Sequence, residues 1–145
     1  MKRIVCNEDV CIGCHLCEIA CVTEHSRSKD VIKAYKEESP RPNSRNLVEE
    51  KEAISFSVNC QHCDEPACVE ACIAGAMVKN YETGVVSHNP EKCVGCWSCV
   101  MSCPRGAIKI DPNKTKVIKC DLCPDREVPA CVAACPNRAL SYEEK

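Results

Sequence analysis

The strongest constraint on this chain is a cysteine-rich phrase that occurs four times. Each copy begins with Cys-x2-Cys and ends with Cys-x3-Cys, and only the gap between these pairs varies, at two, four, two and seven residues. The pairs are therefore constrained, whereas the gap is a loop. The copies take sixteen of the seventeen cysteines, namely Cys11, Cys14, Cys17 and Cys21; Cys60, Cys63, Cys68 and Cys72; Cys93, Cys96, Cys99 and Cys103; and Cys120, Cys123, Cys131 and Cys135.

Composition favours a fold held together by metals or disulfides. The chain has 145 residues with 17 cysteines and 3% aromatic residues, so any apolar core is small. The first cysteine, Cys6, leaves no room for a signal peptide, and no apolar run approaches the roughly eighteen residues of a membrane span. We therefore expect a cytoplasmic protein without membrane insertion, in which reduced thiols bind metal. The net charge of -2 argues against a nucleic-acid partner.

Local patterns predict an α+β fold of short elements. Runs of β-branched residues before the copies predict strands at Arg3 to Val5, Ile54 to Val58, Val85 to Val86 and Lys116 to Ile118. The segments AGAMV, RGAIKI and NRALSY, which follow three of the copies, each predict a turn and a second strand.

The 38 residues between the first two copies interrupt this rhythm. Here we expect a helix around Val31 to Lys36, and then a hairpin of Asn46 to Glu49 against Ile54 to Val58. The charged residues of this interval are expected to form a solvated face, with docking of a partner as the alternative.

The spacing within the copies points to iron-sulfur chemistry. The third copy, Cys93 to Pro104, matches the bacterial ferredoxin run C-x2-C-x2-C-x3-C-P at every position. Four thiolates suit the corners of a [4Fe-4S] cube, and in two-cluster ferredoxins the fourth cysteine ligates the other cluster. Because residues four apart share one face of a helical turn, each Cys-x3-Cys is expected to tie two clusters together.

The residues inside Cys-x2-Cys differ between copies. Gly13 and Gly95 permit unusual backbone angles and close approach to cluster sulfur. Copies two and four instead carry Gln61-His62 and Asp121-Leu122. These two loops are therefore expected to hydrogen-bond the sulfurs differently, which is one determinant of redox potential.

Other interpretations fit less well. A zinc-stapled interaction module is the alternative, but zinc ribbons usually combine two well-separated Cys-x2-Cys pairs, and disulfides conflict with the expected compartment. Cys6 is expected to be a partly buried strand residue, and Trp97 to cover a cluster from solvent. No histidine is assigned as a ligand, since surface or outer positions suffice for His15, His25, His62 and His88.

The segments VNCQHCDEPACVEACIAGAM, NPEKCVGCWSCVMSCPRGAI and KCDLCPDREVPACVAACPNRAL resemble four-cluster ferredoxin-type electron-transfer subunits. Such subunits accompany molybdenum or tungsten oxidoreductases, formate dehydrogenases, hydrogenases and carbon monoxide dehydrogenases. The segment KAYKEESPRPNSRNLVEE is most similar to ferredoxin-like proteins associated with carbon monoxide dehydrogenase. The resemblance covers essentially the whole chain.

The resemblance implies one compact polyferredoxin domain, 1–145, with two pseudo-symmetric units. An inner unit, 54–111, contains copies two and three; an outer unit, 1–24 with 112–145, contains copies one and four; and 25–53 is an insertion. The 16 residues between Cys103 and Cys120 also allow a sequential pairing, so both pairings stay open on spacing alone. The implied ligand sets are Cys11, Cys14, Cys17 with Cys135; Cys21 with Cys120, Cys123, Cys131; Cys60, Cys63, Cys68 with Cys103; and Cys72 with Cys93, Cys96, Cys99.

The function implied is electron relay in anaerobic metabolism, with no catalytic residues. Four [4Fe-4S] clusters would pass single electrons between a catalytic oxidoreductase subunit and a second redox partner. The catalytic subunit is expected to be of the carbon monoxide dehydrogenase, aldehyde or formate oxidoreductase, or hydrogenase type. A flavin-dependent NAD(P) oxidoreductase is the expected second partner. A subunit needed mainly to assemble an enzyme is a further hypothesis.

Overall fold

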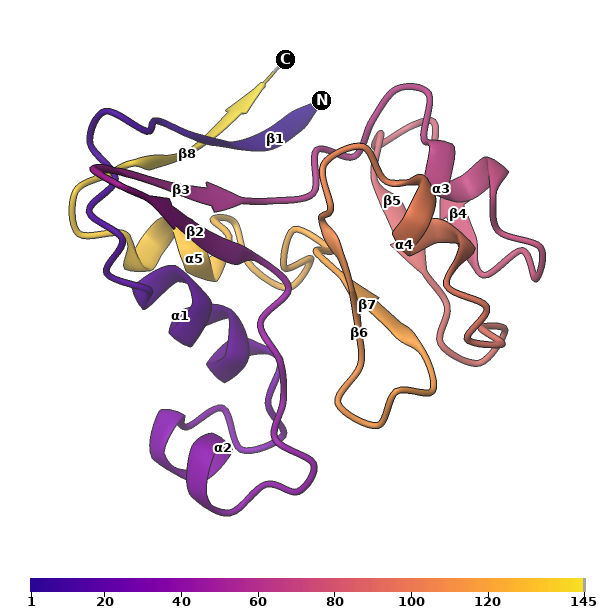
Figure 1. Cartoon of the computed structure of the whole chain (residues 1–145), viewed down its shortest axis with the longest axis horizontal. Helices are drawn as coiled ribbons and strands as arrows, with labels where there is room; N and C mark the ends of the chain where they lie inside the picture. Colours follow the sequence, from indigo (N-terminus) through magenta and orange to yellow (C-terminus); the bar gives the residue numbers. More distant parts are fainter. Residues whose placement is uncertain (145) are drawn as a thin grey trace.

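The computed structural model describes residues 1–144 and consists of short helices and strands (Figure 1). This mixed composition confirms the α+β class. The described residues form α1 (Leu16–Glu24), α2 (Val31–Lys36), α3 (Ala67–Glu70), α4 (Ser98–Ser102) and α5 (Ala130–Ala134), and β1 (Lys2–Cys6), β2 (Leu47–Lys51), β3 (Ile54–Val58), β4 (Met77–Lys79), β5 (Val86–His88), β6 (Ile108–Ile110), β7 (Val117–Lys119) and β8 (Leu140–Glu144).

The strands form two-stranded antiparallel sheets that join distant parts of the sequence. Strand β1 pairs with β8 near the end of the described chain, with Lys2 opposite Glu144 and Cys6 opposite Leu140. Strand β4 pairs with β5, and β6 pairs with β7. Strand β3 pairs with β2. Each strand that precedes a copy, namely β1, β3, β5 or β7, is therefore paired.

Helices pack in pairs on either side of the molecule. Helix α1 packs against α5, and α3 packs against α4. In Figure 1 the first pair lies with β1 and β8, the second pair lies with β4 and β5, and β6 and β7 lie between the two groups. Copies one and four of the cysteine phrase are thus neighbours in space, as are copies two and three.

The interval between copies one and two contains the predicted helix and hairpin. Helix α2 begins after Asp30, whose Oδ1 atom accepts the main-chain N–H groups of Ile32 and Lys33, each at 2.9 Å. Strands β2 and β3 pair with Leu47 opposite Val58. Both expectations are confirmed, and the hairpin extends two residues further along the first strand than predicted.

The apolar core is small and rich in cysteine. Ile4, Val48, Leu122 and Leu140 are buried together with Ala107 and four cysteines of the repeated phrase. A second buried cluster joins Met77, Ile108 and Val117 to another cysteine. Four of the nine residues of the first cluster are cysteines, and further, partly buried cysteines pack against the second, so the elements pack largely around cysteine side chains.

Among residues 1–144, no helix has the length and apolar character needed to span a bilayer.

Candidate metal centres

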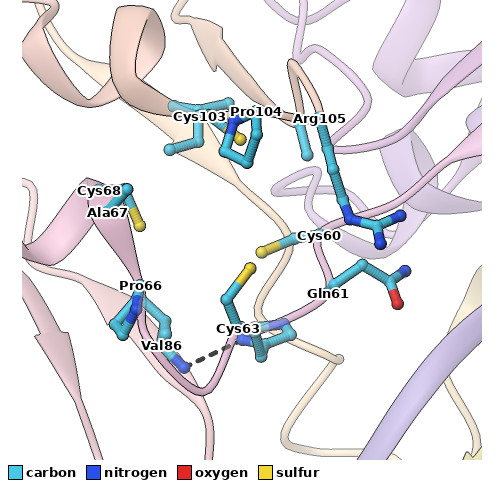
Figure 2. Close-up of a pocket in the computed structure, with 13 residues that line it drawn as sticks. Cys60, Gln61, Cys63, Pro66, Ala67, Cys68, Val86, Cys103, Pro104 and Arg105 are labelled. Carbon is cyan, nitrogen blue, oxygen red and sulfur yellow. Dashed lines mark hydrogen bonds between the residues drawn. The ribbon is translucent and has the colours of Figure 1, made fainter.

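The structure gathers the sixteen repeated cysteines around four cavities, four cysteines at each. Each cavity takes three cysteines from one copy of the phrase and the last from another copy. We name them site A (Cys60, Cys63, Cys68 and Cys103), site B (Cys72, Cys93, Cys96 and Cys99), site C (Cys11, Cys14, Cys17 and Cys135) and site D (Cys21, Cys120, Cys123 and Cys131). Figure 2 shows the four cysteines of site A around their common space.

The closing Cys-x3-Cys of each copy divides its two cysteines between neighbouring sites. Helix α1 carries Cys17 at site C and Cys21 at site D. The helices of the other three copies are shorter than α1, and the second cysteine of each pair lies at or beyond the helix end. Cys103 and Cys135 are C-caps of α4 and α5 with extended backbone. The spacing still delivers the two sulfurs to adjacent cavities.

The donor chemistry of these cavities fits [4Fe-4S] clusters. Every site offers four sulfur atoms, and the seventeen cysteines are all free thiols rather than disulfides. The walls of site B are otherwise largely apolar, with Met77, Val117 and Trp97 among them. Soft sulfur ligands in apolar surroundings suit an iron-sulfur cluster better than a carboxylate-preferring cation.

A left-handed residue recurs at the third position of every Cys-x2-Cys. The φ angles are 64° at Gly13, 46° at His62, 70° at Gly95 and 64° at Leu122. The backbone therefore turns in the same sense in all four loops, although only two of them contain glycine. This common geometry was not predicted for copies two and four, whose loops were expected to hydrogen-bond the sulfurs differently.

Close approach of a main-chain atom explains the glycine at Gly95, whereas at Gly13 the nearest neighbours are side-chain atoms. A Cβ atom on Gly95 would lie 2.3 Å from the carbonyl oxygen of Thr115. One on Gly13 would lie 2.6 Å from Oε1 of Glu50. A side chain at either position requires its neighbour to move.

Main-chain N–H groups donate to the last cysteine sulfur of several copies. Ala76 donates to Sγ of Cys72, and Ala139 donates to Sγ of Cys135, each at 3.2 Å. In both cases the donor lies four residues after the cysteine. Hydrogen bonds to ligand sulfur stabilise added negative charge and are one of the determinants of cluster potential.

Burial in the fold favours the protonated form of several of these thiols. It raises the pKa of Cys68 to about 11 and that of Cys131 to about 12, and it also raises the pKa of Cys120. Since iron binds thiolate, loading these sites must release protons.

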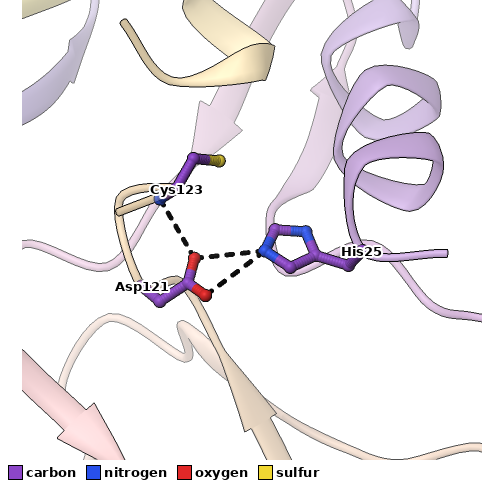
Figure 3. Close-up of side chains that lie close together, drawn as sticks. All are labelled: His25, Asp121 and Cys123. Atoms are coloured by element: carbon purple, nitrogen blue, oxygen red, sulfur yellow. Dashed lines mark hydrogen bonds and ion pairs between the residues drawn. The ribbon is translucent and has the colours of Figure 1, made fainter. Parts of the chain in front are cut away.

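Site D has a charged network in its wall that the sequence analysis did not anticipate. Nε2 of His25 lies 3.1 Å from Oδ1 of Asp121 (Figure 3). Nη1 of Arg45 lies 2.6 Å from Oδ2 of the same carboxylate. Oδ1 of Asp121 also accepts the N–H of Cys123 at 3.1 Å. The only hint in the sequence was an aspartate inside the fourth Cys-x2-Cys.

This network changes the protonation of both partners. Burial alone would lower the pKa of His25, but the Asp121 carboxylate and the nearby Cys21 raise it to about 9. Burial alone would raise the pKa of Asp121, but His25 and Arg45 outweigh it and hold that pKa below its usual range. The charged forms of His25 and Asp121 are therefore favoured.

The other histidines lie outside the sulfur sets. His62 is buried in the wall of site A, where its Nδ1 atom accepts the N–H of Val86 at 3.0 Å (the dashed line in Figure 2). Burial, with the charge of Lys119, lowers its pKa to about 3. His88 lines site B, whereas His15 is exposed and contacts Glu18.

Cys6 and Trp97 lie where the sequence analysis expects. Cys6 is partly buried on β1 and lines none of the four sites, and its sulfur accepts the N–H of Ser57 at 3.3 Å. Burial raises the pKa of this thiol. Trp97 is half-buried in the wall of site B.

Comparison with known sequences identifies the family of this chain. Residues 52–145 match the 4Fe-4S dicluster domain family. The chain belongs to this family of ferredoxin-type electron-transfer proteins. It is 35% identical to an iron-sulfur protein of Rhodospirillum rubrum over 94% of this chain and 79% of that relative. It is also 35% identical to the B subunit of the anaerobic dimethyl sulfoxide reductase of Escherichia coli, over 91% of this chain and 68% of the relative.

Other relatives are longer than this dicluster-family chain. It is 32% identical to the iron-sulfur subunit of formate dehydrogenase-O from Escherichia coli, over 93% of this chain but 50% of that subunit. The chain therefore spans about half the length of this relative. The names of these relatives agree with the expected electron-transfer subunit rather than a catalytic one.

A solved structure shares the fold. The active site complex BamBC of benzoyl coenzyme A reductase, as isolated, contains a chain that is 24% identical, with a TM-score of 0.57. The likeness covers 100% of this chain and 78% of that one.

Proposed function

We propose that this chain relays single electrons through four [4Fe-4S] clusters, one at each of sites A to D. The gathering of sixteen cysteines into four sulfur-lined cavities is the observation that supports this proposal. When bound, each cluster supplies a centre that accepts and gives up one electron without bond chemistry. The protein supplies four cysteine ligands to each cluster, limits the access of water to it and holds neighbouring sites close together.

The order of the sites follows from the segments that they share. Helices α3 and α4 supply cysteines to both A and B, while α1 and α5 supply both C and D. Cys60 of site A, Cys17 of site C and Cys120 of site D belong to one buried cluster of side chains, and Cys60 also acts electrostatically on Cys120. We infer the linear order B, A, D, C, in which A with B and C with D form two pseudo-symmetric ferredoxin-like units.

The two ends of this order are the best places for redox partners. Cys96 of site B and Cys14 of site C are exposed, whereas the cysteines of sites A and D are buried or half-buried. We infer that a catalytic oxidoreductase subunit docks at one end and a second redox partner at the other. Relatives named as subunits of formate dehydrogenase and dimethyl sulfoxide reductase support this role. A carbon monoxide dehydrogenase, aldehyde oxidoreductase or hydrogenase type of partner, a flavin-dependent NAD(P) oxidoreductase and a cytoplasmic location belong to the same proposal.

Cluster content tests the first part of the proposal. Protein purified without oxygen is expected to be brown and to contain about sixteen iron atoms and as much acid-labile sulfide. Cys63→Ser is expected to lower the iron content, whereas the matched variant Cys6→Ser, outside the four sites, is expected to retain it. A colourless protein that contains zinc would overturn the proposal in favour of a structural module.

Partner capture and a split assay test the relay. Affinity purification without oxygen from the native cells is expected to recover a catalytic oxidoreductase, whose cofactor identifies the reaction. With that complex, Cys63→Ser is expected to abolish electron delivery to the physiological acceptor while activity with an artificial dye survives. Loss of both activities would instead indicate a role in assembly.

A further inference from the structure

A buried lysine between sites A and D has no anionic partner in the described part of the chain. Lys119, the last residue of β7, is 3% exposed. Its ammonium nitrogen donates to the carbonyl oxygens of Val86 at 2.5 Å and Cys120 at 2.7 Å. Among residues 1–144, none of its neighbours is a carboxylate within ion-pair distance, although lysine is almost never fully buried unless it is paired.

The two carbonyl groups lie at the boundary between the two sites. Val86 lines site A and Cys120 lines site D. The ammonium group is therefore held at the junction of the inner and outer parts of the chain, where the proposed path crosses from one to the other.

Burial of an ammonium group without an anionic partner destabilises the folded protein. Two carbonyl dipoles solvate it only in part, and taking a charge out of water costs free energy unless an opposite charge compensates. The sulfur sets on either side offer that compensation once they hold clusters, since each cluster with four thiolates carries net negative charge.

We propose that Lys119 is a buried counter-charge for the clusters at sites A and D and that it raises their midpoint potentials. The inference rests on the proposed function, because it requires those clusters to be present. Reduction by a one-electron donor makes a cluster one unit more negative and breaks no bond. A fixed positive charge stabilises the reduced form more than the oxidised form, so it raises the potential.

Redox titration of the loaded full-length protein tests this role. Midpoint potentials are measured without oxygen by electron paramagnetic resonance for the wild type and for Lys119→Met, which keeps length but removes the charge. We expect one or two of the four clusters to shift to lower potential in Lys119→Met. We expect Lys119→Arg, which keeps the charge, to restore potentials close to the wild type.

A surface variant separates the local effect from net charge. Lys114 is exposed in the turn between β6 and β7, and Lys114→Met removes the same unit of charge. All four potentials are expected to remain at their wild-type values in this variant. An equal shift in Lys114→Met and Lys119→Met would overturn the inference, as would unshifted potentials in fully loaded Lys119→Met.

If a variant cannot hold its clusters, its iron content is measured in place of the midpoint potentials. Lys119→Gln removes the charge but keeps an N–H donor toward the carbonyl groups. Loss of iron in Lys119→Met and Lys119→Gln but not in Lys119→Arg supports the counter-charge, whereas equal loss in Lys119→Arg contradicts it. Wild-type protein without four clusters would instead overturn the proposed function, so the two failures are distinguishable.

Discussion

The main-chain N–H of Arg45 donates to the Sγ atom of Cys21 across 3.2 Å, although 24 residues separate them. Cys72 and Cys135 receive the equivalent bond locally, from Ala76 and Ala139 four residues on. Copy one differs because helix α1 continues past Cys21 to Glu24. The segment between copies one and two therefore completes site D from a distance.

Asp121 accepts a hydrogen bond from the side chain of Arg45, the residue whose main-chain N–H donates to Cys21. We predict that Asp121→Ala speeds the release of iron from one of the four sites several-fold, because Arg45 and His25 lose their acceptor. Hydrogen bonds to charged groups contribute about 2 kcal/mol each when partly buried. Release is measured by the colour of an iron chelator after mixing with loaded protein.

A second aspartate provides the control. Asp111 accepts the N–H groups of Thr115 and Lys116, at 2.7 and 3.0 Å, in the turn between β6 and β7, outside the walls of the four sites. Asp111→Ala is expected to release iron at the wild-type rate. Equal acceleration in both variants would mean that general loosening, rather than the wall of site D, controls the release.

Much of the local structure followed from the sequence. Helix α2 has the predicted bounds, Val31–Lys36, and the strands β1, β3, β5 and β7 lie where β-branched runs precede the cysteines. These elements were predictable because their signals are local, such as the β-branched runs that directly precede the cysteines. The same short-range logic correctly placed Cys6 on a strand.

The site walls were less predictable because their residues come from distant segments. Arg45 meets Asp121 across 76 positions, and Lys119 meets Val86 across 33. Neither pair has a characteristic spacing in the sequence from which the contact could be predicted. The left-handed turn at His62 and Leu122 was also missed, because a non-glycine residue is a weak predictor of positive φ. Here the surrounding contacts, rather than intrinsic preference, hold the backbone in that conformation.

Among the glycines at the third position of Cys-x2-Cys, Gly95 of copy three is expected to contribute most to stability. We predict that Gly95→Ala destabilises the loaded protein by more than about 2 kcal/mol, because it adds a clash with Thr115 O to the cost of the left-handed backbone. Gly106 also has positive φ, at 59°, but a Cβ there meets nothing within 4 Å. Gly106→Ala is therefore expected to cost about 1 kcal/mol. Chemical unfolding followed by absorbance of the bound iron compares the variants, and equal costs would contradict the role of the clash.

Exposure predicts which clusters are lost first. Cys14 and Cys96 are exposed, so sites B and C are open to reagents that attack ligand sulfur, whereas Cys60, Cys120 and Cys131 are buried. We predict that a mild oxidant with a chelator removes about half of the iron in a fast phase and the remainder in a slow phase. Iron release is followed together with the electron paramagnetic resonance signals that arise from interaction between paired clusters. A single phase for all the iron would show that exposure of these sulfurs does not limit attack.

Complete removal of metal is expected to unfold most of the chain. Four of the nine residues in the larger buried cluster are cysteines of the sites: Cys17, Cys60, Cys120 and Cys131. Without a cluster these thiols give the core little apolar area, and the short helices and two-stranded sheets are marginal by themselves. Far-UV circular dichroism is therefore expected to show loss of most helix and strand signal after chelation, with recovery when iron and sulfide are restored, because binding free energy contributes directly to folding. A metal-free chain that kept its full spectrum and unfolded cooperatively would instead place the stability in the packing of Ile4, Val48, Leu122 and Leu140.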